Sequence, residues 1–222
     1  QVAAVLSIEG GEALDKDLTI LQAYYRLGVR SLGLTWNYRN ALADGVAERE
    51  TKGGLTAFGK SVVKEMNRLG MIIDVSHLAE AGFWEVLELS TSPVIASHSN
   101  CQRVHEHPRN LTDAQLKGLA QKGGVVGITL VKPFLGLGEP DINTVMEHME
   151  HALSVAGPEH VGIGTDFDGV DDPVLGLEEV SKLPRLIDAM QDRGFSEGMI
   201  RQIMGENYLR LIRAVLNRGQ TG

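Results

Sequence analysis

The chain has 222 residues, of which 43% are hydrophobic and 23% are charged, as in an ordinary soluble globular protein with a sizeable core. Its net charge is -8 and it carries no cluster of Lys or Arg, so the sequence gives no electrostatic basis for binding nucleic acid or an anionic membrane. The single cysteine, Cys101, excludes an intrachain disulfide framework, and no apolar run approaches the roughly 20 residues of a membrane span. Small solutes are therefore the expected partners.

Six short aliphatic runs alternate with longer amphipathic segments along the chain. The runs predict strands at Val2–Ser7, Val29–Thr35, Met71–Val75, Pro93–Ser97, Gly124–Leu130 and Val161–Gly164. The amphipathic segments predict helices at about Asp15–Leu27, Thr56–Leu69, Ala79–Leu89, Thr112–Lys122, Ile142–Ala156, Leu177–Arg193 and Ser196–Asn217. Strands and helices in strict rotation indicate an α/β protein with a parallel sheet covered by helices.

Two architectures use this rotation, an open doubly wound sheet and a closed (β/α)8 barrel of the TIM type. A nucleotide-binding open sheet carries G-x-G-x-x-G after an early strand, whereas Ile8–Glu12 has an acid where a pyrophosphate would approach. Polar residues at the strand ends are typical of a barrel, whose active site forms on the face where all strands end. We predict a single barrel domain over residues 1–222 with about six of eight βα units, and expect the first two units to precede Gln1.

Four predicted strand ends carry residues that can bind a metal ion: Glu9, His77, His98 and Asp166. Taken singly, a strand-end histidine is more often a hydrogen-bonded structural residue, and Asp166 has an alternative role as a helix cap. Together, two imidazoles and two carboxylates on one rim suit Zn²⁺ or a similar divalent ion, which would offset their desolvation. Such a site generates hydroxide near neutral pH and polarises a carbonyl, which is the chemistry of a hydrolase.

Other polar residues give weaker indications. Arg109 lies in the loop after the fourth predicted strand, where its guanidinium could clamp a substrate carboxylate or form a structural salt bridge. His148 and His151 are three residues apart between acids and are interpreted as a solvated helix face. Cys101 is interpreted as a small loop residue, and Asn110–Thr112, although it matches a glycosylation sequon, as helix-capping sequence.

Short motifs along the whole chain are similar to those of one known family. They are SIEGG (Ser7–Gly11), YRLGVR (Tyr25–Arg30), LTWN (Leu34–Asn37), ALADG (Ala41–Gly45), GMIIDVSH (Gly70–His77), PVIASHS (Pro93–Ser99), PRN (Pro108–Asn110), GIGTDFDG (Gly162–Gly169) and GENY (Gly205–Tyr208). In this order they resemble the renal or membrane dipeptidase family, most closely its bacterial members. The resemblance implies a (β/α)8 barrel of the amidohydrolase kind that holds two zinc ions. Its members cleave dipeptides and, in some cases, β-lactams or dipeptides that contain a D-residue.

The resemblance also implies a role for each candidate residue. Glu9 stands where the family has a glutamate that bridges the two metal ions, and His77 and His98 match the two histidines of the second zinc. Asp166 matches the aspartate that handles the proton during attack by a metal-bridging hydroxide. Arg109 matches the arginine that holds the substrate carboxylate.

Three departures from the family pattern affect these expectations. The first zinc of the family is held by a His-x-Asp pair at the end of the first barrel strand, and no such pair precedes Glu9, in agreement with the two missing barrel units. Trp36 stands where mammalian members have a histidine, as it often does in bacterial relatives, and is predicted to contact substrate. No tyrosine near Leu130–Pro133 matches one that helps with the substrate carboxylate in some members, so Arg109 would act without it.

We therefore predict a zinc-dependent dipeptidase in the cytoplasm, with a dipeptide as its partner and no nucleic-acid partner. Whether it forms a homodimer is left open, as is a signal or anchor preceding Gln1. One alternative is another amidohydrolase-type hydrolase of a lactone or cyclic amide, which Glu9 disfavours because such enzymes usually carry a carboxylated lysine as the bridge. The other alternative is a non-catalytic barrel remnant that lacks the first metal site.

Overall fold

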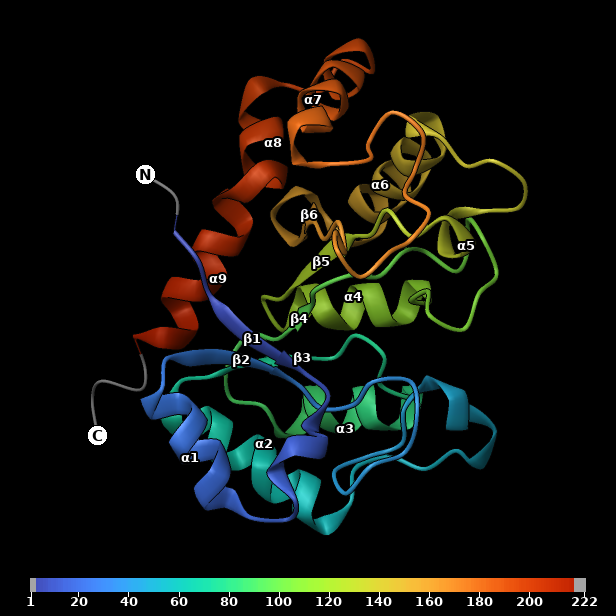
Figure 1. Ribbon diagram of the computed structural model, residues 1–222. Coiled ribbons are helices and arrows are strands. Elements are labelled where there is room, and N and C mark those ends of the chain that lie inside the picture. Colours follow the sequence, from blue (N-terminus) through green and yellow to red (C-terminus); the bar gives the residue numbers. More distant parts are fainter. Residues whose placement is uncertain (1–2, 218–222) are drawn as a thin grey trace. The chain divides into compact units, whose positions relative to one another are not determined.

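The computed structural model describes residues 3–217, in which six strands alternate with helices (Figure 1). The described chain forms two compact units. The first contains the residues up to Ile95 and those from Arg210 onward, and the second spans Ala96–Leu209. The prediction of a single domain over residues 1–222 stays a prediction.

The strands of the first unit form a parallel ladder in chain order. They are β1 (Leu6–Glu9), β2 (Val29–Gly33), β3 (Ile72–Asp74) and the first residue of β4 (Ile95–Ala96). Ser31 of β2 pairs with Ser7 on one side and with Ile72 on the other, and Asp74 pairs with Ile95. Because the strands are parallel, their carboxyl ends lie at the same edge of the ladder.

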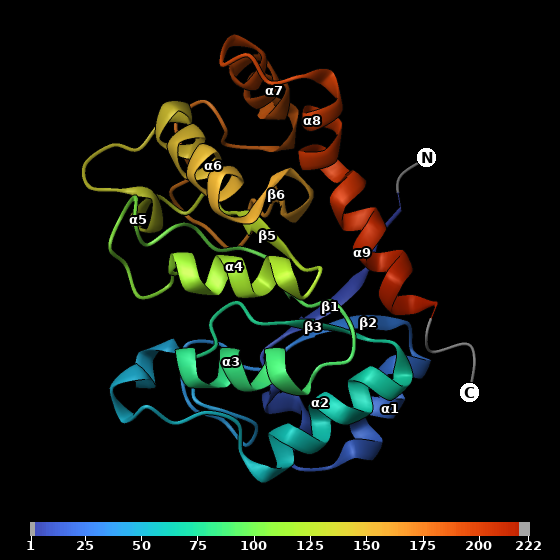
Figure 2. The same cartoon turned by 180° about the vertical axis from the view of Figure 1, so that it is seen from behind.

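Helices cover one side of this ladder. They are α1 (Leu18–Arg26), α2 (Ala57–Leu69) and α3 (Glu80–Leu89), and both views show them on the same side of β1–β3 (Figures 1 and 2). Two 3₁₀ turns, η1 (Gly11–Leu14) and η2 (Val46–Thr51), lie in the loops. Helix α2 shows how the sequence sets the bounds, because Thr56 Oγ1 accepts the Gly59 N–H at its start and Gly70 ends it at φ 72°.

In the second unit, β5 (Val125–Ile128) pairs in parallel with β6 (Val161–Ile163). Its helices and turns are α4 (Asp113–Gln121), α5 (Lys132–Leu135), α6 (Ile142–Ala156), η3 (Pro158–His160), η4 (Val180–Lys182), α7 (Leu183–Asp192), α8 (Glu197–Arg201) and the π-helical η5 (Gln202–Glu206). The last helix, α9 (Asn207–Leu216), continues into the first unit at Arg210. Within residues 3–217, none of the helices combines the length and the apolar composition that crossing a bilayer requires.

The strands supply much of the buried core. All four residues of β5 and all three of β3 are buried, which is expected of parallel strands covered on both faces. Strand β1 differs, because three of its four residues are exposed and Leu6 keeps 57% of its surface. Fully buried side chains from the helices complete the cores, among them Val62, Met66, Phe83, Leu116, Leu119, Met146 and Met149.

Most predicted elements agree with the structure to within two residues at each end, and three begin later than that. The first predicted strand begins at Leu6, and its Val2 lies outside the described residues. The first predicted helix begins at Leu18 rather than at Asp15, because Asp15 and Lys16 adopt left-handed φ values of 39° and 63°. The helix predicted over Leu177–Arg193 begins only with η4 and α7.

The helix predicted over Ser196–Asn217 is interrupted. Helix α8 gives way to the π-helical η5, within which Gly205 has φ 170° and ψ −28°, outside the helical region. Helix α9 then continues to Leu216. A continuous amphipathic pattern did not reveal this interruption because a π insertion shifts the register without removing apolar residues.

Candidate metal centre

Glu9 is the last residue of β1 and stands in register with Gly33 of β2. The next residue, Gly10, donates its N–H to the Gly33 carbonyl at 3.2 Å and has φ 92°, a conformation that glycine adopts without strain. The Glu9 side chain remains 50% exposed. Its carboxylate is therefore placed at a strand end and remains accessible to solvent.

His77 follows β3 in a tight turn. Ser76 N–H donates to Asp74 Oδ1 at 3.0 Å, and Val46 N–H donates to the His77 carbonyl at 2.7 Å. His77 has φ 66°, a left-handed conformation that costs a residue with a Cβ about 1 kcal/mol or more. Such strain concentrates at functional sites, where the surrounding structure enforces it.

Both imidazole nitrogens of His77 have partners within the first unit. Nδ1–H donates to Asn37 Oδ1 at 2.8 Å, because an amide oxygen can only accept. Nε2 then presents a lone pair 3.0 Å from Glu9 Oε1. Two acceptors that face each other this closely need a cation, either a proton on Nε2 or a metal ion that both atoms bind. The pair therefore fits a metal, with Asn37 fixing the tautomer as outer partners of ligating histidines do.

Trp36 lies beside this pair. Its ring centroid is 6.1 Å from that of His77 and 6.2 Å from that of Tyr38, and 46% of its surface is exposed. A large aromatic surface that is open to solvent next to a candidate ligand can contact a bound molecule. The position agrees with, but does not test, the substrate-contacting role predicted for Trp36.

His98 lies in the second unit, two residues after β4, and is 8% exposed. Its Nδ1 is 2.8 Å from Ser97 Oγ, so the hydroxyl fixes that side of the ring. The His98 carbonyl accepts from Arg109 Nη2 at 3.2 Å, and the next N–H, of Ser99, donates to the Gly127 carbonyl at 2.8 Å. The backbone around His98 is therefore held by both Arg109 and β5.

Tyr208 supports the same segment from α9. Its hydroxyl donates to the Ser97 carbonyl at 3.4 Å, and its ring lies so close to β6 that a Cβ at Gly162 would be 2.5 Å from Cε2. A Cβ at Gly164 would be 1.9 Å from the Ser97 carbonyl oxygen. Only glycine permits these approaches. The π-helical turn that precedes Tyr208 is of a kind found frequently at functional sites.

Arg109 is only 6% exposed. Its guanidinium carbon is 5.3 Å from the centroid of the Phe134 ring, and its backbone N–H donates to His107 Nδ1 at 3.2 Å. Packing of this kind orients the planar guanidinium fork, as the recognition of a carboxylate requires.

Asp166 follows β6 and is half-buried. It has φ 61°, and the turn is closed by Gly169 N–H, which donates to the Asp166 carbonyl at 3.1 Å. The alternative role of Asp166 as a helix cap is wrong, because the next helical turn, η4, begins only at Val180. Asp166 shares with His77 a left-handed backbone directly after a buried strand.

The prediction of a solvated helix face is wrong for His148, which is fully buried. Its Nδ1 accepts the Cys101 N–H at 3.1 Å, so the proton is on Nε2, which donates to the Leu135 carbonyl at 2.9 Å. Burial lowers the pKa of His148 to about 4, and the imidazole is neutral at pH 7. His151 is half-buried, with Nε2 at 2.7 Å from Asp113 Oδ1.

Two other minor interpretations can be compared with the structure. Cys101, interpreted as a small loop residue, is buried, and burial raises the pKa of its thiol to about 12, so it is not a thiolate nucleophile. Asn110 donates both of its amide hydrogen bonds to backbone carbonyls at 2.8 Å, which leaves the amide closed to glycosylation. The predicted capping role belongs to Thr112, whose Oγ1 accepts the Gln115 N–H.

Within single units, the structure brings together Glu9 with His77 and Trp36, and His98 with Arg109. A joint site made by all the predicted residues stays a prediction. Sequence reasoning missed the residues that orient the two histidines, which are Asn37, Ser97 and Tyr208. Each lies inside a motif noted in the sequence. The presence of a polar residue within these motifs was therefore the feature that could have identified them.

Two curated proteins are similar over almost the whole chain. The dipeptidase verJ of Clonostachys rogersoniana is 41% identical over 216 residues, which are 97% of this chain and 56% of that protein. An uncharacterized protein in the pqqA 5' region of Klebsiella pneumoniae is 38% identical over 224 residues, which cover 96% of this chain and 82% of that protein.

Among solved structures, a metallo peptidase of Rhodobacter sphaeroides, crystallised with a phosphinate mimic of the dipeptide L-Ala-D-Ala, has a TM-score of 0.90 and 36% identity. The match covers 95% of this chain and 63% of that one, so the chain spans less than two thirds of this peptidase and of the Clonostachys dipeptidase. This likeness confirms the predicted α/β fold of the TIM-barrel type. A model of the membrane dipeptidase family, peptidase family M19, matches residues 1–221, and the chain therefore belongs to that family.

Proposed function

We propose that the complete protein is a metal-dependent dipeptidase. The observation that carries the proposal is the Glu9–His77 pair, in which two acceptors face each other at 3.0 Å while Asn37 fixes the histidine tautomer. Membership in a dipeptidase family and the dipeptide mimic bound by the Rhodobacter peptidase support the same reaction.

His98 is the third ligand in this proposal, and the strand register supports it. Asp74 of β3 pairs with Ile95 of β4, so these residues stand at the same level of two parallel strands. His77 is the third residue after Asp74, and His98 is the third residue after Ile95. Equal offsets from paired positions favour two ligands at the same edge of the ladder.

Zn²⁺ is the proposed ion, because imidazole nitrogen and carboxylate oxygen are ligands that it binds at about 2.0–2.2 Å. A divalent ion held at this position would lower the pKa of a bound water molecule and would polarise the peptide carbonyl. In the complete protein we propose two such ions, which Glu9 would help to hold.

The other residues of the chain act on substrate and protons. The Asp166 carboxylate accepts a proton from the attacking water and donates it to the leaving amine as the peptide C–N bond breaks. The Arg109 guanidinium binds the carboxylate of the dipeptide, and Trp36 contacts the substrate near His77. The half-burial of Asp166 and the buried guanidinium of Arg109 next to the Phe134 ring support these roles.

The test uses the full-length protein, dipeptides and a panel of lactones and cyclic amides. We expect dipeptide hydrolysis that a chelator abolishes and added Zn²⁺ restores. The variant His98→Ala should lose one metal ion per chain in elemental analysis, and most of the activity. His160→Ala, whose Nδ1 lies 2.8 Å from the Gly124 carbonyl oxygen, serves as the matched control.

Full metal content and activity in His98→Ala would contradict the ligand assignment. Hydrolysis of a lactone or cyclic amide in place of dipeptides would favour the other amidohydrolase-type reaction. Metal binding without any hydrolysis would favour a non-catalytic remnant. A cytoplasmic location, a single folding domain and a homodimer remain proposals that fractionation, limited proteolysis and sedimentation test.

A further inference from the structure

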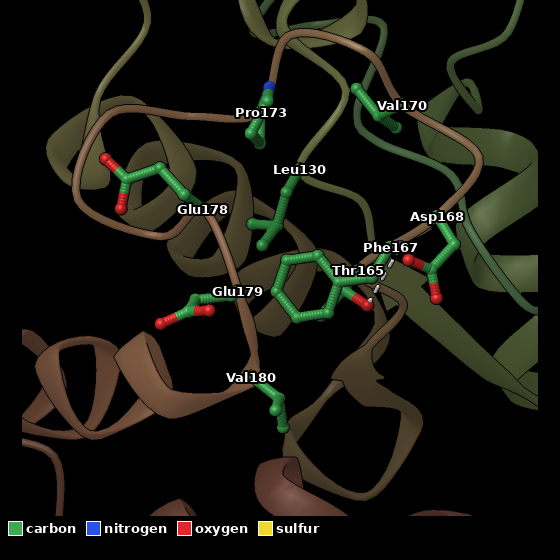
Figure 3. A pocket seen from close by; sticks show the side chains of 9 residues that line it. All are labelled: Leu130, Thr165, Phe167, Asp168, Val170, Pro173, Glu178, Glu179 and Val180. Carbon is green, nitrogen blue, oxygen red and sulfur yellow. Dashed lines mark hydrogen bonds between the residues drawn. The ribbon is translucent and has the colours of Figure 1, made fainter.

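A cavity of about 320 Å³ lies in the second unit, at the carboxyl ends of β5 and β6. Its lining residues are Leu130, Thr165, Phe167, Asp168, Val170, Pro173, Glu178, Glu179 and Val180 (Figure 3). The volume is within the roughly 300–1,000 Å³ range of small-molecule sites. Asp166 lies between two lining residues, Thr165 and Phe167, so the cavity adjoins the candidate proton carrier along the chain.

The loop that forms the cavity is held in place by the rest of the unit. Pro173 pairs with Val131 and Leu175 pairs with Asp141, each through an isolated β-bridge. At the start of the loop, Phe167 N–H donates to Thr165 Oγ1 at 3.3 Å. The cavity is therefore a preformed feature rather than a gap beside a loose loop.

The cavity combines an apolar interior with acidic flanks. Figure 3 shows Leu130 and Phe167 in the middle, with the two glutamates on one side and Asp168 on the other. Leu130 is 1% exposed, whereas Asp168, Glu178 and Glu179 are exposed. None of the lining residues is a lysine, an arginine or a histidine.

Nearby cations do not neutralise all three carboxylates. Lys132 is engaged by Asp172 and Glu139, at 2.7 and 3.2 Å. Lys182 and Arg185 act on Glu178, although the Gly176 N–H is the main reason that the pKa of Glu178 is lowered. In the described part of the chain, neither Asp168 nor Glu179 forms an ion pair with a lysine or arginine.

We propose that this cavity is a subsite for a long basic side chain, that of Lys or Arg, on the N-terminal residue of a dipeptide. Such a side chain has an apolar stem, which Leu130 and Phe167 can cover, and a cationic tip, which the carboxylates can pair with. The acidic flanks repel the carboxylate of the substrate, so the N-terminal residue is the one that faces the cavity. This inference rests on the proposed dipeptidase function and adds its substrate class.

The test compares Lys-Ala with norleucine-Ala, which has a similar stem without the charge, and with the reversed Ala-Lys. We expect kcat/KM for Lys-Ala to exceed that for norleucine-Ala about 10-fold, and to exceed that for Ala-Lys, because the carboxylates attract the ammonium group of lysine and not the methyl end of norleucine. In the double variant Asp168→Asn, Glu179→Gln, the preference over norleucine-Ala should fall to about 2-fold or less. Hydrolysis of Ala-Ala should be unchanged, as in the control Glu197→Gln on α8.

Equal rates for Lys-Ala and norleucine-Ala, or a preference that survives in the double variant, would overturn the subsite. Calorimetric binding of the same dipeptides to the full-length protein separates this inference from the proposed function. If no dipeptide is hydrolysed but Lys-Ala binds more tightly than norleucine-Ala, and only when Asp168 and Glu179 are intact, the subsite stands and the dipeptidase proposal fails. Equal binding overturns the subsite whatever the enzyme hydrolyses.

Discussion

The end of β3 and the middle of α6 each bury a histidine, but they use it differently. His77 after β3 is 7% exposed and His148 in α6 is 0% exposed, so burial does not distinguish them. Their partners do. His148 is satisfied by two backbone groups, one on each ring nitrogen, whereas His77 turns Nε2 toward the half-exposed carboxylate of Glu9.

This difference separates the structural histidine from the proposed ligand. A histidine whose two nitrogens already bond to backbone has no lone pair to offer, and its neutral form is fixed by burial. A histidine with one nitrogen fixed by an amide and the other facing a carboxylate keeps a lone pair for a cation. The first should therefore control stability, and the second should control metal binding and rate.

The largest expected effect is that of His77→Ala on activity. We expect kcat/KM for a dipeptide to fall about 1000-fold, which corresponds to about 4 kcal/mol, because a ligand should matter more than the 10–100-fold typical of an outer partner. Metal content by elemental analysis should fall with it. Activity within 10-fold of the wild type would show that His77, despite its position, is structural like His148.

The next effect concerns His148 and stability. Its folded pKa of about 4 lies below the ordinary value of 6.5, so the unfolded chain binds the proton more tightly. The stabilisation is present above about pH 6.5 and is lost as the pH falls toward 4. We expect the wild type to lose about 3 kcal/mol of unfolding free energy over this range through His148.

The matched variant for this prediction is His148→Gln, which cannot titrate. Urea unfolding of both proteins at several pH values gives the difference in unfolding free energy, and that difference should narrow or reverse as the pH falls. At pH 7 the folded molecules of the variant should hydrolyse dipeptides with the same kcat/KM as the wild type. A constant difference between pH 7 and pH 4 would contradict the buried neutral state of His148.

Asn37→Ala should have an intermediate effect. The variant removes the acceptor that holds Nδ1–H of His77, so the ring loses its fixed tautomer. Metal affinity, measured by competition with a chelator, should fall about 10–100-fold. Asn217→Ala, an exposed asparagine in the described chain, is the control. Unchanged affinity would mean that the Glu9–His77 pair is held without Asn37.

The sequence predicted the helix that carries His148 with its observed bounds, but not the place of this residue in it. The acids around His148 and His151 suggested a solvated face, while the buried positions Val145, Met149 and Ala152 form a stripe at helical spacing that includes His148. The signal was present in the periodicity. Charge near a residue was a poorer guide than its position on the apolar stripe.

Strand ends were predictable because aliphatic runs stop abruptly near polar residues, which are Glu9, His77, His98 and Asp166. The loops between them were not, since their form depends on partners far away in the sequence. One such contact is the bridge between Gly45 and Leu78, and another is that between Val131 and Pro173, which helps to form the cavity. Local propensity carries no information about such pairings.

The smallest expected effect is that of Tyr208→Phe, which extends the comparison to the support of His98. The variant keeps the ring that packs on Gly162 and removes only the hydroxyl that donates to the Ser97 carbonyl at 3.4 Å. A single neutral hydrogen bond of this length should contribute about 0.5–1 kcal/mol to the unfolding free energy, measured with urea at constant m value. A loss above about 2 kcal/mol would show that the hydroxyl, rather than the ring, holds this segment. A small loss together with weaker metal binding would instead show that metal binding by His98 requires a fixed backbone at Ser97, just as metal binding by His77 requires a fixed tautomer.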